Sequence, residues 1–376
     1  MSPVLLSLGM GVDSTGILVR WLTDPASRDF PLSALTVVIS QVGDEYPDTY
    51  EAIGTDVLPM LAHHRVRLVQ LARPALTLSR GRPKYVVLDD SAGPARLVRS
   101  GPVRLSDELT VNGTIAQVSN RRCSLRWKGE PIDAWVAEHM PAGHRHVLVY
   151  AANETRRIDR DRAITRNGRR PDYPLQRWNW DRATTSRFLL DATGRRFERS
   201  CCAHCPFQAA VANRDRWAVR WQQHPNAAIL ALRLEYTAMA LNPRMRLFGA
   251  HSARELGNLH GLGPLIARAD ERLATLPWAL YDVRRTYTGP AAAMRSVRLL
   301  AQGSRNSMCA ELARLGPVTV DEHGIRRVWR HRPRPGYPRV EHLLVAAPAG
   351  VLNKQRRSFE PQWTALTAPA GCGFTA

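Results

Sequence analysis

VLLSLGMGVDST, residues 4–15, is the stretch that decides the fold, and it runs directly into the apolar segment GILVRWL, residues 16–22. An apolar run that breaks into small and hydroxylated residues and then resumes predicts a buried strand, a glycine turn and the start of a helix. Glycines let the backbone approach a ligand closely, and the N–H groups and hydroxyls of a helix N-terminus favour an anion. We therefore expect a phosphate-binding loop, with an ordinary structural turn as the alternative.

Two common nucleotide motifs do not fit this loop. A Walker loop needs a Lys before its Ser or Thr, and a dinucleotide fingerprint needs a third glycine at a spacing that is missing here. Residues 7–15 instead resemble the pyrophosphate loop (PP-loop), usually Ser-Gly-Gly-x-Asp-Ser, of the N-type ATP pyrophosphatases and the PAPS reductase family, with two extra residues before the Asp. The resemblance implies that nucleotide phosphates lie over Ser7, Gly9, Gly11, Asp13, Ser14 and Thr15.

The composition sets wider limits. A chain of 376 residues with 44% apolar residues can form one large α/β domain and a smaller unit. No apolar run of membrane-spanning length and no secretory signal is visible, so we expect a cytoplasmic protein without a membrane partner. The net charge of +20 has two interpretations, attraction to nucleic acid or a bias in composition.

The second expected strand, residues 35–40, ends in a group of carboxylates. Asp44 and Glu45 would lie at the ligand-binding edge of a parallel sheet, where they can bind a ribose hydroxyl or Mg²⁺. The alternative is that Asp48 caps the helix expected over residues 51–63 and that Glu45 compensates its dipole. The segment resembles the region after strand two in the PAPS reductase family, with Asp44, Pro47, Thr49 and Tyr50 as the matching positions.

Two further strands are expected at residues 65–71 and 146–152, separated by an insertion over residues 72–120 that has β-like pieces at 85–88 and 109–111. Glu154, Arg156 and Arg157 follow the fourth strand, where a nucleotide phosphate or an acceptor would lie, and the resembled family has a similar Glu-x-x-Arg element. Residues 158–199 are rich in arginine and contain aromatic residues, which is typical of a nucleic-acid surface or of rings packed on the sheet.

A cysteine lies within RRCSLRWKGEPI, residues 121–132. The four flanking cations predict a lowered pKa for Cys123, and Arg126 and Lys128 could hold a phosphate or sulfate. The alternative is a buried, inert cysteine. The segment resembles the sulfonucleotide reductase pattern Arg-Cys-Cys-x-x-Arg-Lys-x-x-Pro-Leu, with Ser124 in place of the second cysteine.

The strongest metal signal is SCCAHCPF, residues 200–207. Its Cys-x-x-Cys pair is compatible with zinc, a redox dithiol or an iron–sulfur cluster. The spacing from Cys123 resembles that of cluster-bearing sulfonucleotide reductases and of the ATP pyrophosphatase of DNA phosphorothioation. This resemblance implies a 4Fe-4S cluster on Cys123, Cys202 and Cys205, with Cys201 as the nearest fourth ligand and Cys309 as a remoter one; zinc with His204 is the alternative.

The rest of the chain is expected to be helical at residues 209–222, 226–239, 270–273 and 291–299, followed by a small β-containing unit. Cys372 stands in a Cys-Gly pair near the end of the chain, without the Glu and His of the sulfonucleotide reductase tail. We therefore do not expect Cys372 to be catalytic, which counts against a sulfate-assimilation reductase.

Together, these segments predict an α/β fold with a doubly wound parallel sheet, resembling the adenine nucleotide α-hydrolases, over residues 1–207, and a helical and mixed region over residues 208–376. The resemblance implies an ATP pyrophosphatase that adenylates an acceptor, such as tRNA or DNA, for sulfur transfer. Mg²⁺ would accompany the ATP, and a cysteine desulfurase is an example of the sulfur donor. Asp13, Ser14, Arg126, Lys128, Arg156 and Arg157 would act in catalysis. The alternatives are an oxidoreductase acting on APS or PAPS, and a non-catalytic nucleic-acid-binding protein.

Overall fold

The computed structural model describes residues 2–78, 81–118, 121–164, 168–287, 289, 293–332 and 340–368. The chain divides into two compact units. Unit 1 comprises Met1–Asp107 and Ser119–Cys205, and unit 2 comprises Glu108–Val118 and Pro206–Ala376. A short piece of the region expected as an insertion therefore belongs to the second unit, and Cys372 lies outside the described residues.

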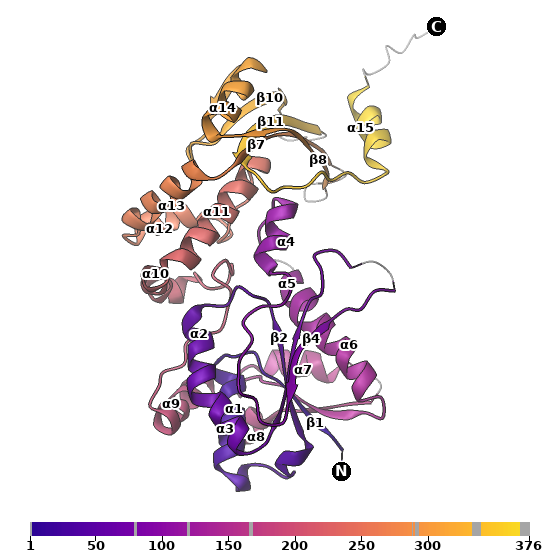
Figure 1. Ribbon diagram of the computed structural model, residues 1–376, viewed down its shortest axis with the longest axis vertical. Helices are drawn as coiled ribbons and strands as arrows, with labels where there is room; N and C mark the ends of the chain where they lie inside the picture. Colours follow the sequence, from indigo (N-terminus) through magenta and orange to yellow (C-terminus); the bar gives the residue numbers. More distant parts are fainter. Residues whose placement is uncertain are drawn as a thin grey trace. The chain divides into compact units, whose positions relative to one another are not determined.

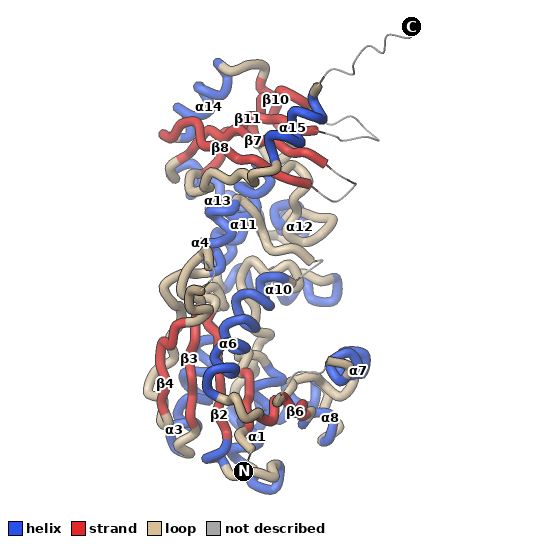
Figure 2. Tube along the Cα trace, turned by 90° about the vertical axis from the view of Figure 1, so that its right-hand side faces the viewer, coloured by secondary structure: helices blue, strands red, loops and turns tan. Residues whose placement is uncertain are grey.

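Unit 1 is built on a mixed, mostly parallel sheet of six strands in the order β4-β3-β2-β1-β5-β6. Figure 2 labels β4, β3, β2 and β6 of this sheet. Every neighbouring pair is parallel except β3 with β4. The strand that precedes the glycine loop lies in the interior of the sheet, and the chain continues to one side of it first and to the other side later. The strand bounds are β1 Val4–Ser7, β2 Leu35–Gln41, β3 Arg67–Ala72, β4 Val86–Ser91, β5 His144–Val147 and β6 Arg169–Asp172.

Helices cover both faces of this sheet because its strands are apolar on both sides. In β1, Val4 and Leu6 belong to the core formed with the helix after the glycine loop, whereas Leu5 belongs to a second core that contains Trp135. The helices on the first face are α1 Val12–Thr23, α2 Pro47–Ala52, the π-helical turn Ile53–Val57, α3 Leu58–His63, α8 Pro174–Arg177 and α9 Arg182–Thr193, and α6 Glu130–His139 lies on the second.

The first helix and α9 pack very closely (Figure 1). A Cβ atom on Gly16 would lie 2.2 Å from Thr185 Cγ2, so any side chain at residue 16 would force the helices apart. The close approach positions the glycine loop against the start of α9.

Three expected elements before residue 153 differ from the observed structure. The second helix begins at Pro47 rather than at residue 51, and β5 covers His144–Val147 rather than residues 146–152. The β-like piece expected at residues 109–111 is wrong, because these residues are in helix α4, Leu105–Asn112. The buried Leu105 and Leu109 are four residues apart, which is the spacing of one helix face.

Unit 2 contains an antiparallel sheet in the order β8-β7-β11-β10-β9 (Figure 1). The β-containing unit expected near the end of the chain is confirmed, but the helix expected at residues 291–299 is wrong for its described part. There Val297, Leu299 and Ala301 alternate onto the core as a strand. The strands are β7 Trp278–Tyr287, β8 Ala293–Gly303, β9 Val318–Val320, β10 Arg326–His331 and β11 Val340–Pro348.

The expected helices at residues 209–222, 226–239 and 270–273 correspond to helices of unit 2. They are accompanied by further helices, and the bounds are α10 Arg214–Gln223, α11 Pro225–Leu241, α12 Ala253–Leu259, α13 Gly263–Thr275, α14 Arg305–Arg314 and α15 Phe359–Thr367. Within the described ranges, no helix is long and apolar enough to cross a membrane.

Candidate functional site

The glycine loop connects β1 to α1 at the carboxyl edge of the sheet. The Leu8 N–H donates to the Val38 carbonyl at 2.9 Å, which extends the parallel pairing by one residue beyond β1. Met10 then takes the left-handed conformation, with φ of 59°, and Gly11 is the N-cap of α1. The sharp turn is thus made by Met10 rather than by a glycine. Gly11 is required for another reason, since a Cβ atom there would lie 3.0 Å from Ser200 Oγ.

The first turn of α1 has polar groups that its own chain does not use. No side chain caps the helix at Gly11, so the first N–H groups have no side-chain acceptor there. The Ser14 hydroxyl donates to the Gly11 carbonyl at 3.2 Å. Thr15 Oγ1 is fully buried and has no hydrogen-bond partner among the described residues. An unpartnered hydroxyl at a helix start without a side-chain cap fits a site for an anionic ligand.

A cation that sequence reasoning missed lies beside this turn. Arg182, the first residue of α9, donates from Nε to Asp13 Oδ2 at 3.1 Å. The bond to Asp13, and then the charge of Glu154, raise the pKa of Arg182. Asp13 follows β1 and Glu154 follows β5, so Arg182 interacts with carboxylates on both sides of the point where the strand order reverses. Ligands of open α/β sheets bind at this point. The arginine-rich composition of residues 158–199 was the only signal for Arg182.

The other predicted residues after β5 belong to the start of α7, Thr155–Arg162. Glu154 accepts the Ala151 N–H at 3.1 Å and pairs with Arg157 at 2.5 Å. The Arg157 guanidinium also lies 4.4 Å from the centroid of the Tyr150 ring. Arg156 and Arg157 are both exposed, so they can reach an anion in solvent.

A second polar group forms where β2 ends. Glu45 and Cys202 form an antiparallel bridge, and the Ala203 N–H donates to the Asp44 carbonyl at 3.1 Å. The Cys205 N–H donates to the Cys202 carbonyl at 2.9 Å and closes the Cys-x-x-Cys turn. These contacts hold the cysteines against the carboxylates that were predicted at the end of the second strand.

The Cys123 segment reaches the same edge through a π-helical turn, Leu125–Gly129. The Ser40 hydroxyl, in β2, donates to the Trp127 carbonyl at 2.7 Å. The Arg73 guanidinium, just after β3, donates to the Arg126 carbonyl at 3.2 Å. Residues 123–128 are therefore fixed at the carboxyl ends of β2 and β3, with Arg126 half-buried.

Lys128 is paired with Glu45. Its Nζ lies 2.7 Å from Glu45 Oε1, and the Glu45 side chain is only 1% exposed. Burial favours the neutral amine, but Glu45 and then Cys202 outweigh it and raise the pKa of Lys128. Lys128 is therefore a fixed positive charge beside Cys202.

The expectation of a lowered pKa for Cys123 is wrong. Burial, and then the neighbouring Cys205 thiol, raise the pKa of Cys123. The flanking Arg121 and Arg122 are exposed and so are screened by water, while Lys128 is paired with Glu45. Burial and Glu45 raise the pKa of Cys202 still further. In the metal-free protein these cysteines are thiols rather than activated thiolates.

The remaining members of this group are Asp44 and His204. The Ser106 N–H and hydroxyl donate to the two oxygens of Asp44, at 2.6 and 2.8 Å. His204 is buried, and neither of its ring nitrogens has a hydrogen-bond partner among the described residues. Its Nε2 lies 3.9 Å from Asp44 Oδ2, and burial lowers the pKa of His204. Asp44 is thus already used by Ser106, and His204 is a neutral imidazole.

The cysteines that were predicted as metal ligands lie near one another. Within the described ranges, the one set of three Cys, His, Asp or Glu ligand atoms that lie within 4.8 Å of one another is in unit 2 and contains no cysteine. In addition to burial, Cys205 contributes to the raised pKa of both Cys123 and Cys202, so the three thiols are neighbours. Cys201, Cys202 and Cys205 are all half-buried.

One segment connects the glycine loop with the cysteines. The Ser200 hydroxyl donates to the Gly9 carbonyl at 2.6 Å, and two residues later Cys202 forms its bridge with Glu45. Two residues of extended chain span at most about 7 Å. The predicted phosphate loop and the predicted cysteine site are therefore neighbours at one edge of the sheet. Ser200 was not predicted as a site residue, although it directly precedes the cysteines in the sequence.

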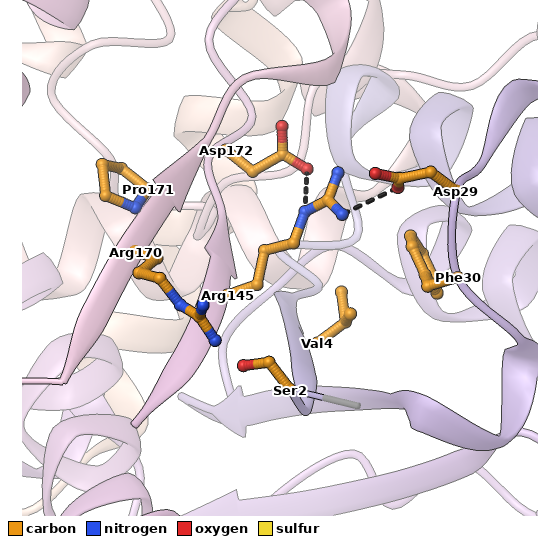
Figure 3. A pocket seen from close by; sticks show the side chains of 8 residues that line it. All are labelled: Ser2, Val4, Asp29, Phe30, Arg145, Arg170, Pro171 and Asp172. Carbon is orange, nitrogen blue, oxygen red and sulfur yellow. Dashed lines mark hydrogen bonds and ion pairs between the residues drawn. The ribbon is translucent and has the colours of Figure 1, made fainter. Parts of the chain in front are cut away.

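A pocket of about 440 Å³ lies elsewhere in unit 1 and contains none of the predicted site residues (Figure 3). Arg145 points into the space between two carboxylates, and its guanidinium lies 2.7 Å from both Asp172 and Asp29. The bond from Arg145 lowers the pKa of Asp29. This cation is neutralised on both sides, so it is not available to an anionic ligand.

No protein-family model, curated protein or solved structure matches this chain.

Proposed function

We propose that this protein is a PP-loop ATP pyrophosphatase, with a doubly wound fold like that of the adenine nucleotide α-hydrolases, which adenylates an acceptor for sulfur transfer. The observation that carries the proposal is the short segment from Ser200 to Cys202, which contacts the glycine loop at one end and Glu45 at the other. Activation at the loop and sulfur chemistry at the cysteines would then occur within a few ångströms of each other.

The glycine loop would bind the phosphates of ATP. The N–H groups at the start of α1 and the buried Thr15 hydroxyl are suited to phosphate oxygens. The exposed Arg156 adds positive charge, which stabilises negative charge as it develops on the phosphates, and Arg182 neutralises Asp13 beside the loop. Mg²⁺ would enter with the nucleotide and neutralise part of its charge.

The proposed reaction is nucleotidyl transfer. An oxygen of the acceptor attacks the α-phosphorus of ATP, the bond from that phosphorus to the bridging oxygen breaks, and pyrophosphate leaves with the electron pair. The acceptor is then linked to AMP, a good leaving group that a sulfur nucleophile can displace. A nucleic-acid acceptor such as tRNA or DNA suits the net charge of +20.

Cys123, Cys202 and Cys205 would hold a 4Fe-4S cluster, with Cys201 as the nearest candidate for the fourth ligand. If only Cys123, Cys202 and Cys205 held the cluster, one iron would have no protein ligand and could bind the sulfide for transfer. Lys128 would remain paired with Glu45 beside Cys202 and balance negative charge at the thiolate ligands.

The first test is ATP binding by matched variants of α1. Thr15→Val removes a hydroxyl that has no partner among the described residues, whereas the control Thr23→Val removes one that donates to the Val19 carbonyl at 2.9 Å. Loss of a ligand hydrogen bond of about 1 kcal/mol should weaken ATP binding by roughly 5- to 10-fold in Thr15→Val. Thr23→Val should bind ATP normally. Equal affinities in both variants, or no ATP binding by the wild type, would contradict the proposed nucleotide site.

The second test addresses the cysteines. Protein purified without oxygen should contain iron and acid-labile sulfide, and Cys123→Ala and Cys202→Ala should lose both. Conversion of ATP to AMP and pyrophosphate, followed with label in the α-phosphate and a pool of tRNA or DNA, tests the reaction itself. Sulfite release from APS or PAPS with a thiol donor would instead identify a reductase.

A further inference from the structure

Unit 2 contains a compact group of potential metal ligands that lies wholly outside the proposed ATP site. It consists of Glu255, Glu322 and His323, whose ligand atoms all lie within 4.8 Å of one another. Glu255 is in α12, and the other two residues are in the turn between β9 and β10. Two carboxylates and one imidazole form a ligand set that divalent transition metals accept.

The imidazole Nε2 of His323 has no hydrogen-bond partner among the described residues. This nitrogen is buried, and the side chain as a whole is 5% exposed. It faces Glu255 Oε1 at 3.5 Å and Glu322 Oε1 at 3.4 Å. Both distances exceed those of a normal N–H···O hydrogen bond, which are about 2.7–3.2 Å. A buried nitrogen aimed at two carboxylate oxygens is costly unless something lies between them.

These distances match the edges of a metal coordination sphere. With bonds of about 2.0–2.2 Å to nitrogen and oxygen, a tetrahedral zinc ion places neighbouring ligand atoms about 3.3–3.5 Å apart. Both measured separations are within, or at the limit of, that range. The Glu322 side chain is 69% exposed and the Glu255 side chain 37%, so an ion can enter and water can occupy a remaining position.

Neighbouring groups hold the ligands in place. Glu255 Oε2 accepts the Ser252 N–H at 2.8 Å, which leaves Oε1 directed at His323. Asp321 Oδ1 accepts the N–H groups of His323 and Ile325, both at 3.0 Å, and so fixes the turn that carries the histidine. Such supporting bonds orient metal ligands in known sites.

One cation competes for this site. Arg246 lies 3.4 Å from Glu322 Oε1 and is held there because it also donates to the Pro243 and Met245 carbonyls. Its charge opposes a divalent ion but does not reach His323 as a hydrogen-bond donor, since His323 Nε2 has no partner among the described residues. An ion pair between Arg246 and Glu322 alone therefore leaves the geometry of the histidine unexplained.

We propose that Glu255, Glu322 and His323 bind one divalent transition-metal ion, best matched by Zn²⁺, which links α12 to the turn between β9 and β10. The proposal does not depend on the ATP pyrophosphatase proposal.

The test is equilibrium dialysis of metal-stripped, full-length protein against Zn²⁺ alone. Glu322→Gln and His323→Asn should each lose one bound equivalent, with affinity at that site reduced by at least about 100-fold. The matched control is Glu311→Gln, which changes a glutamate on α14 that pairs with Arg314 and should bind as the wild type does. Zinc bound by the cysteines is the same in all four proteins and cancels in the comparison.

Two further points complete the experiment. Glu322 is exposed, so Glu322→Gln folds even if replacement of the buried His323 disturbs the turn. Arg246→Ala removes the competing cation and should tighten Zn²⁺ binding. If Glu322→Gln and His323→Asn bind as many equivalents as Glu311→Gln, or if Arg246→Ala loses the ion, the proposal is overturned.

Discussion

Replacement of Lys128 by Met should destabilise unit 1 by about 3 kcal/mol. The Lys128 Nζ lies 2.7 Å from a Glu45 carboxylate whose side chain is 1% exposed, so methionine would leave that carboxylate buried without its counter-charge. Breaking a buried ion pair costs about 3–5 kcal/mol. We expect the lower end of this range because the Lys128 side chain is itself 34% exposed and water can partly replace it.

A double-mutant cycle separates this effect from simple loss of packing. When Lys128 is replaced, Glu45→Gln removes the buried charge that would otherwise be unpaired. The free energy of unfolding of the double variant should therefore lie within about 1 kcal/mol of that of the wild type. The matched control is Arg67→Met, which breaks a pair with Asp90 at the same 2.7 Å but with side chains 41% and 33% exposed. An exposed pair contributes about 0–1 kcal/mol, so this control should change stability little.

The measurement is urea denaturation of reduced, metal-free protein, followed by circular dichroism. The free energy of unfolding is compared among the wild type, Lys128→Met, Glu45→Gln, the double variant and Arg67→Met. The reasoning is refuted if Lys128→Met costs no more than Arg67→Met. It is also refuted if the double variant loses the sum of the two single losses, since Glu45 and Lys128 would then not be coupled.

Two further predictions concern the cores of the two units. Gly16→Ala should cost about 1–3 kcal/mol because its Cβ would lie 2.2 Å from Thr185 Cγ2. Adding Thr185→Ser, which removes that methyl group, should restore most of the lost stability. Gly54→Ala is the control and should cost nothing, because no atom lies within 4 Å of the added Cβ. Thermal melting of the variants measures these differences. Burial raises the pKa of Glu235 from 4.5 to about 7, although three backbone contacts oppose the shift. The folded protein then keeps a proton that the unfolded chain loses, so stability should fall by up to about 3 kcal/mol between pH 4.5 and 7. Glu235→Gln should flatten that decline when melting is measured against pH with a chelator present, and parallel curves for the two proteins would contradict it.

The sequence allowed the central part of unit 1 to be predicted because its signals are local. The alternation of Val4, Leu5 and Leu6 onto two cores follows from a strand that is apolar on both sides, and the glycine loop after it follows from composition alone. The Cys-x-x-Cys turn is likewise visible as a spacing. Such signals come from residues that are neighbours in the chain.

The remaining features depend on partners that are distant in sequence. Lys128 and Glu45 are separated by 83 residues, and Arg182 and Asp13 by 169. The local sequence around each residue contains no signal for its distant partner. The pKa of Cys123 was predicted in the wrong direction for the same reason, since the number of flanking cations is visible in the sequence but their exposure is not. In β8, strand pairing with β7 decided between helix and strand for a segment with mixed local signals.

Residues 108–118 belong to unit 2, although the rest of that unit begins only at Pro206. This arrangement affects both the synthesis of the chain and any exchange of domains. The Val111 carbonyl accepts the Leu352 N–H at 2.9 Å, and the Gly113 carbonyl accepts Arg295 at 3.1 Å. The buried Ile115 in this segment leaves the ribosome long before those partners are made. Unit 2 is therefore not a detachable C-terminal domain. A chain cut after Cys205 would leave the apolar segment around Ile115 without its partners, and a functional transplant of unit 2 needs three junctions rather than one, because the chain crosses between the units after Asp107, Val118 and Cys205.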